Sequence, residues 1–174
     1  AIELRRDYQE LRARLDALPS ELTKLQDQQA RSKAIISSLN TSLPVLDEVV
    51  KKLKIESDKA QEEFKALFST LEVAQKDLGE SDKACKAAPT PECEALVNEK
   101  KVKVADLQKA FIEKRESSKN LKSEYDAKSK ELEIQKKTLA QTQLELRGVE
   151  DRLVEALKLQ QDGKLKLVQL ERDL

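Results

Sequence analysis

The sequence predicts an all-α fold, a long antiparallel coiled-coil hairpin of two helices. Three observations lead to this fold class. Apolar residues recur every seven positions along both halves of the chain, and two prolines interrupt the pattern near its midpoint. The composition is typical of long helices, with 38% charged residues, 3% aromatic residues and three glycines among 174 residues. A narrow apolar seam of this kind indicates helices that pair along their length.

The first half of the chain carries two interlocked sets of seam positions, which are the a and d positions of a coiled coil. One set is Leu4, Leu11, Leu18, Leu25, Ser32, Leu39, Leu46, Leu53, Ala60, Leu67, Ala74 and Ser81. The other set is Tyr8, Leu15, Leu22, Gln29, Ile36, Leu43, Val50, Ser57, Phe64, Leu71, Leu78 and Cys85.

The second half carries its own two sets at the same spacing. One set is Val97, Val104, Phe111, Ser118, Tyr125, Leu132, Leu139, Leu146, Leu153, Gln160, Leu167 and Leu174. The other set is Cys93, Lys100, Leu107, Lys114, Leu121, Lys128, Gln135, Thr142, Val149, Ala156, Gly163 and Leu170. The second half is less apolar than the first, but it keeps the seven-residue repeat throughout.

A turn is predicted between the two halves. Pro89 and Pro91 cannot both lie inside one helix, because each lacks a backbone donor and crowds the preceding turn. Thr90, Pro91 and Glu92 together form a typical helix start, with an N-cap, a proline at the first helical position and an acid in the first turn. Because the connection is short, the two helices should pack antiparallel.

The whole chain, 1–174, is therefore interpreted as one hairpin. Its first arm is about 1–86, its tip turn is 87–91 and its second arm is about 92–174. Seam positions on opposite arms face each other if their residue numbers sum to about 175 or about 182. The sequence leaves that choice open, since the residue numbers of Cys85 and Cys93 sum to 178, which lies between the two values.

Pro19 and Pro44 are expected to kink the first arm, because an interior proline costs about 3 kcal/mol. Thr41 and Ser42 offer caps for a new helix at Pro44, so the alternative is a three-helix bundle of 1–43, 44–84 and 92–174. The hairpin is favoured over this bundle because the seven-residue spacing runs through both prolines. A bundle would also leave the seam of 133–174 without a partner.

The two cysteines are predicted to form a disulfide. Cys85 and Cys93 are the only cysteines, they flank the turn, and both occupy seam positions that face each other. The alternative is a pair of free thiols that act as small apolar residues. A disulfide predicts an extracytoplasmic location, in the periplasm or at a cell surface, whereas free thiols would fit the cytoplasm.

Three lysines occupy seam positions at intervals of fourteen residues: Lys100, Lys114 and Lys128. One interpretation is that they fix pairing and orientation at some loss of stability. The interpretation favoured here is that their stems cover small neighbours while their ammonium groups reach water.

A base interface is predicted at the open end, because eight of the nine arginines lie in that half of the hairpin and extra apolar residues lie off the seam there. Its residues are Arg5, Arg6, Leu157, Leu165 and Val168. A partner-binding tip is predicted at the turn. Its residues are Lys86, Ala87, Ala88, Pro89, Thr90, Pro91 and Glu92.

Several function classes are not expected. The chain has no histidine, the commonest general base, and no glycine-rich phosphate loop, so we expect neither an enzyme nor a small-molecule substrate or cofactor. Two cysteines without histidine do not complete a zinc site, so no metal is expected. Equal numbers of acidic and basic residues, 33 each, disfavour nucleic acid as a partner. No apolar run is long enough to insert into a membrane. The first residue is Ala1 rather than methionine, which suggests an excised or processed segment.

The expected function is therefore that of a non-catalytic structural and protein-interaction arm, a helical spacer that contacts protein partners, or further copies of itself, at its tip or base. In outline the hairpin resembles those of periplasmic membrane-fusion adaptors in bacterial efflux and secretion systems, and the receptor-binding hairpins of colicins. The resemblance implies the alternative function, an extracytoplasmic recognition hairpin that binds through its tip. Adaptor hairpins carry an arginine, leucine and serine or threonine signature beside the tip, whereas this chain has no arginine between Arg31 and Arg115.

Overall fold

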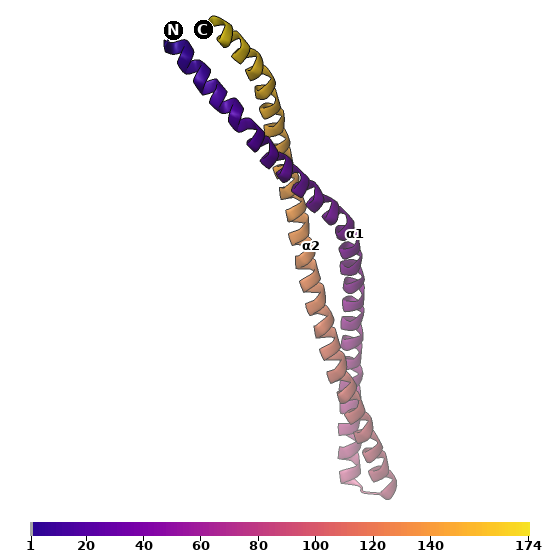
Figure 1. The fold of residues 1–174 in the computed structure, drawn as a ribbon. Helices are drawn as coiled ribbons and strands as arrows, with labels where there is room; N and C mark the ends of the chain where they lie inside the picture. Colours follow the sequence, from indigo (N-terminus) through magenta and orange to yellow (C-terminus); the bar gives the residue numbers. More distant parts are fainter. Residues whose placement is uncertain (1) are drawn as a thin grey trace. The chain divides into compact units, whose positions relative to one another are not determined.

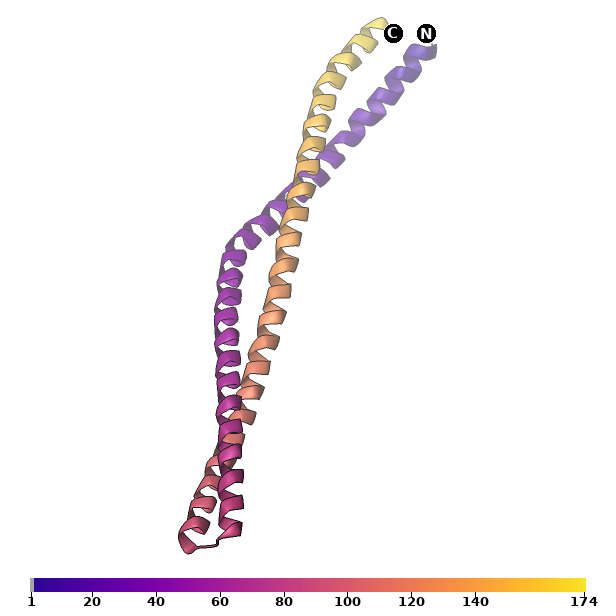
Figure 2. The same ribbon diagram turned by 180° about the vertical axis from the view of Figure 1, so that it is seen from behind.

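The computed structural model describes residues 2–174 and shows an all-α hairpin of two long helices that pack against each other. Helix α1 comprises Ile2–Ala87 and helix α2 comprises Pro91–Asp173 (Figures 1 and 2). Three residues, 88–90, connect them. The predicted fold class is confirmed, and each helix extends one residue further toward the turn than the sequence indicated.

The helices form two compact units. One unit is Val45–Leu132, which includes the turn, and the other combines Ala1–Pro44 with Glu133–Leu174. Within the second unit, six buried side chains form an apolar cluster, and Leu15 and Leu159 pack against it. Its members are Leu18, Leu22, Leu25, Val149, Leu153 and Ala156. In the first unit, Phe64 and Phe111 stack with ring centroids 5.0 Å apart, and Phe68 approaches Phe111 at 5.6 Å.

Both interior prolines lie within the continuous helix α1, so the three-helix alternative is not observed. Thr41 and Ser42, the candidate caps for a new helix at Pro44, instead donate their hydroxyl hydrogens to carbonyls of the preceding turn. Thr41 Oγ1 lies 3.1 Å from the oxygen of Ser37, and Ser42 Oγ lies 3.4 Å from that of Leu39. A hydroxyl used in this way follows an existing helix rather than starting a new one.

The predicted seam is buried or half-buried at every described position except two. Leu174 is 56% exposed, because it lies beyond the last residue of α2. Lys128 is also exposed, and Ser129 occupies the half-buried position instead. The neighbouring seam positions Tyr125, Leu132 and Gln135 keep their register, so the exchange is local and places a hydrated lysine outward and a small serine inward. The seam assignment of Lys128 was therefore wrong.

The pairing register lies between the two sums that the sequence left open. Leu15 packs against Gly163, and a Cβ added to this glycine would come within 2.7 Å of Leu15 Cδ2. The residue numbers of this pair sum to 178, as those of Cys85 and Cys93 do. The residue numbers of Phe64 and Phe111 sum to 175 rather than 178, so these two residues are diagonal neighbours on the same seam. The cysteine pair was thus the better guide to the register.

Candidate functional site: the tip turn and the base

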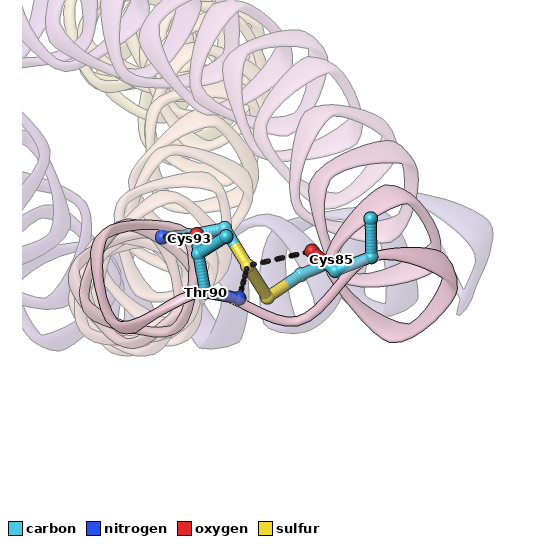
Figure 3. Close-up of a disulfide and its surroundings, with 4 residues drawn as sticks. Cys85, Thr90 and Cys93 are labelled. Atoms are coloured by element: carbon cyan, nitrogen blue, oxygen red, sulfur yellow. Dashed lines mark hydrogen bonds between the residues drawn. A yellow bond between two sulfur atoms is a disulfide. The ribbon is translucent and has the colours of Figure 1, made fainter.

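The tip is closed by the two cysteines. Cys85 and Cys93 lie at disulfide distance, with 2.02 Å between the sulfur atoms and 5.6 Å between the Cα atoms (Figure 3). Cys85 is buried and Cys93 is half-buried. The predicted pairing is confirmed as geometry, and it links the last turn of α1 to the first turn of α2.

Thr90 caps α2, as the sequence predicted, and the cap is reciprocal. The backbone N–H of Cys93 donates to Thr90 Oγ1 at 3.1 Å, and the backbone N–H of Thr90 donates to Cys93 Sγ at 3.2 Å. This is the pattern of a capping box, with a sulfur in the place that a glutamate or glutamine side chain usually takes. The Ala88 carbonyl oxygen lies 3.9 Å from the same sulfur, but a disulfide sulfur carries no hydrogen to donate.

All seven residues of the predicted tip, 86–92, are exposed. Lys86 forms a 2.9 Å ion pair with Asp82 on its own helix, which reduces the net charge it presents. Beside the turn is an open hollow of about 310 Å³ between the two helices, bordered by Asp82, Pro89, Val97 and Lys101 among others. The tip therefore offers a small, mixed polar and apolar surface between two helix ends whose cysteines lie at disulfide distance.

Two of the three seam lysines form ion pairs between the helices. Lys100 Nζ lies 3.0 Å from Asp77 and 2.6 Å from Ser81 Oγ, and Lys114 pairs with Glu63. These contacts support the interpretation that Lys100 and Lys114 fix the pairing of the helices. They do not fit the interpretation that only the lysine stems contact the other helix while the ammonium groups reach water. Lys128 instead pairs with Glu131 on its own helix at 3.1 Å.

The ion pair of Lys114 with Glu63 is expected to make the stability of the unit Val45–Leu132 depend on pH. The hydrogen bond and the charge of Lys114 hold the pKa of the Glu63 carboxyl below the ordinary value of 4.5. Because folding lowers this pKa, the pair's contribution to stability is present above pH 4.5 and is lost as pH falls through the lowered pKa. We expect the difference in unfolding free energy between wild type and Lys114→Gln to shrink as pH falls below 4.5.

Urea titrations at a series of pH values check this, and Lys128→Gln is the matched control, since Lys128 is exposed and pairs only within its helix. The Glu63 carboxyl is solvent-accessible, so added salt should also reduce the difference. A difference that stays constant from neutral to acid pH would contradict this role of Glu63.

At the base, the two helices are joined near the ends of the chain. Tyr8 donates its hydroxyl hydrogen to Glu171 at 3.1 Å, and Arg12 donates to the Tyr8 oxygen at 3.3 Å. Figures 1 and 2 both show the N- and C-terminal ends side by side. Arg5 and Arg6 are exposed near the start of α1.

The apolar residues of the predicted base interface lie on the other helix. Leu157, Leu165 and Val168 are all exposed on α2, and Val154 is exposed near them. Among the hydrogen bonds and ion pairs of the described residues, none joins this part of α2 to Arg5 or Arg6. The residues of the predicted base interface thus come from both helices, with two exposed arginines near the start of α1 and the exposed apolar side chains on α2.

Some features of these surfaces were not predicted from the sequence. Phe68 lies off the seam and still contacts Phe111, and no pattern of residue types indicates the sulfur cap at Cys93. The Ser129 hydroxyl is buried and has no hydrogen-bond partner within the described part of the chain.

Among the described residues, 2–174, no cluster of histidine, cysteine, aspartate and glutamate could hold a metal ion. Within the same range, neither helix contains an apolar stretch sufficient to span a bilayer. The absence of catalysis and of cofactors stays a prediction.

Comparisons with protein-family models, with curated proteins and with solved structures find no match for this chain.

Proposed function

We propose that this chain is a non-catalytic helical arm that contacts protein partners at its tip or base and acts as a spacer in a larger protein. The observation that carries the proposal is the contrast between its two ends. At one end, three residues join the helices beside a cysteine pair at disulfide distance. At the other, Tyr8 and Glu171 hold the ends of the chain together.

Adjacent chain ends suit insertion of an arm into a host protein, because the host then needs only a small gap to accept it. A helix of 86 residues extends for about 129 Å along its own axis at 1.5 Å per residue. The seam ion pairs of Lys100 and Lys114 support the spacer role, because they fix how the two helices pair near the tip. The proposed partners are proteins, with no role for nucleic acid, membrane insertion or a small-molecule substrate.

The second candidate is a recognition hairpin of an extracytoplasmic assembly that binds through its tip. The cysteine pair favours it, because structural disulfides persist mainly in oxidising compartments. The exposed tip also favours it, since residues 86–92 include charged, apolar and hydroxyl side chains on a surface that the cysteines hold together. A thiol-alkylation assay on cells, quenched in acid without reductant, should find both cysteines protected. Two freely alkylated cysteines would remove the argument for this compartment.

Site-specific photo-crosslinking of the full-length protein in its own cells tests the main proposal. A photoreactive residue at Ala88 reports on the tip and one at Val168 reports on the base, whereas Lys136 serves as an exposed control on the shaft. We expect protein adducts from Ala88 or Val168 and none from Lys136. Ala88 is chosen over Thr90 so that the helix cap stays intact. Adducts of equal yield at all three positions, or at none, would refute a role in specific protein contact.

A further inference from the structure

Four exposed apolar side chains form one stripe along the base portion of α2. Val154, Leu157, Leu165 and Val168 are 66%, 50%, 67% and 48% exposed. At about 100° per residue they fall within an arc of about 80° on the helix, centred about 130° from the middle of the seam. Helix α1 packs on the seam and therefore does not cover this stripe.

The order of the four residues is symmetric. They are separated by three, eight and three positions, and Gln161 lies at the centre. If a second copy of α2 is laid antiparallel on the stripe about an axis through Gln161, Val154 meets Val168 and Leu157 meets Leu165 of that copy. A two-fold interface must be self-complementary in this way, because the same surface serves both partners.

We propose that this stripe is a self-association surface on which a second copy of the chain packs antiparallel, with the two-fold axis at Gln161. The proposal deepens the function proposed above and rests on it, since it names a second copy as the partner of the base.

The polar residues around the stripe fit the same arrangement. Glu150 and Arg172 lie eleven positions before and after Gln161. Glu150 of one copy therefore meets Arg172 of the other copy across the axis. Lys158 and Asp162 lie on the same edge of the stripe, and the antiparallel copy brings them within about two residues, or about 3 Å, along the axis. The Gln161 amide has both donor and acceptor groups, so it can pair with its own copy.

A conflict between Lys158 and Lys164 of the second copy is avoided by their angular positions. Both are three residues from the centre, but each lies about 60° from the middle of the stripe, on opposite edges, whereas Leu157 and Leu165 lie only about 40° from it. The two ammonium groups are therefore further apart than the apolar pair. Four apolar side chains per copy cover less than the roughly 800 Å² per partner of a standard interface. We therefore expect weak association that increases with protein concentration.

Cysteine cross-linking of the full chain, with the native cysteine pair retained, tests the geometry. Under mild oxidation Gln161→Cys should form a disulfide-linked dimer, and peptide mapping should show that the two substituted residues at position 161 are joined. The Val154→Cys variant alone should stay monomeric, because the cysteines at position 154 of the two copies would lie about 21 Å apart along the helix axis. Mixing Val154→Cys with Val168→Cys chains should give a mixed dimer.

Self-linked dimers from all three single variants would indicate parallel packing and overturn the proposal. The absence of any cross-link in the Gln161→Cys variant at about 1 mM protein would also overturn it, since weak association should be populated at such a concentration.

A charge-exchange series tests which side chains meet. Leu157→Lys and Leu165→Glu, each in the Gln161→Cys background, should reduce dimer yield about tenfold. The double variant should recover it, because each lysine then faces a glutamate of the other copy. Ile134→Lys is the matched control, since Ile134 is 64% exposed on α2 but lies off the stripe, and it should leave the yield unchanged. Circular dichroism confirms that each variant stays helical. No recovery in the double variant would reject the pairing of Leu157 with Leu165.

The two proposals fail separately. If the Gln161→Cys variant does not cross-link but Ala88 forms a protein adduct in cells, the arm still contacts a partner and only the self-association is lost. If that variant cross-links as a purified chain but the cellular adducts are absent, the surface is real and the proposed function is wrong.

Discussion

Replacing Leu18 by alanine is expected to lower the free energy of unfolding by about 2 to 3 kcal/mol. Leu18 is 2% exposed and belongs to the apolar cluster that contains residues of both helices in the unit that includes Glu133–Leu174. Removing a buried leucine side chain typically costs about 2 to 5 kcal/mol through lost burial and the cavity left behind. The low end applies here because a seam between only two helices lies close to water, so the cavity can relax or fill.

Urea unfolding followed by circular dichroism measures this loss. Leu144→Ala is the matched control: it makes the same chemical change in the same unit, but at a side chain that is 66% exposed. It should change stability by less than about 0.5 kcal/mol. Equal effects of the two variants would mean that the cluster around Leu18 does not hold the base together.

Reducing the disulfide expected between Cys85 and Cys93 should lower the free energy of unfolding by about 2.5 kcal/mol. The two cysteines are eight residues apart, and closing so small a loop restricts the unfolded chain by about this amount in the chain-entropy description. The loss should be felt first at the tip, because the link joins the last turn of α1 to the first turn of α2. We expect faster amide exchange around residues 80–97 in the reduced protein.

Unfolding curves with and without reductant measure the cost. The double variant Cys85→Ser and Cys93→Ser should match the reduced wild type and should not respond to reductant. Serine at position 93 can still accept the hydrogen bond from the Thr90 N–H, so the helix cap is retained in this comparison. Wild-type stability that is unaffected by reductant would show that the pair contributes nothing to the tip.

The sequence predicted the fold because its main determinant is local. A seven-residue repeat of apolar residues can be satisfied only by a helix that packs along one narrow line, and Pro89 with Pro91 leaves one place for the chain to turn. The effect of Pro44 was harder to judge, since Thr41 and Ser42 are good caps in isolation. In the structure the helix is continuous through Pro44, and both hydroxyls bond to carbonyls of the preceding turn.

The details of pairing could be predicted less well, because they depend on the partner helix. The role of Lys114 is set by where Glu63 lies across the seam, and Lys128 is exposed because Ser129 takes its place locally. The tip was predicted correctly in its cysteine pair and its Thr90 cap. The reciprocal bond to sulfur was not predicted, since it depends on backbone geometry that residue types alone do not specify.

The juxtaposed chain ends determine how this molecule responds to mechanical load. A host protein that pulls the two ends apart would first strain the contact between Tyr8 and Glu171, and then each neighbouring seam layer in turn. Separating helices one layer at a time needs less force than sliding them past each other, where many layers resist together. Peeling would proceed toward the turn, where a disulfide between Cys85 and Cys93 would stop it, since tension of that kind does not break such a bond. Once released, the two helices would close again from that end.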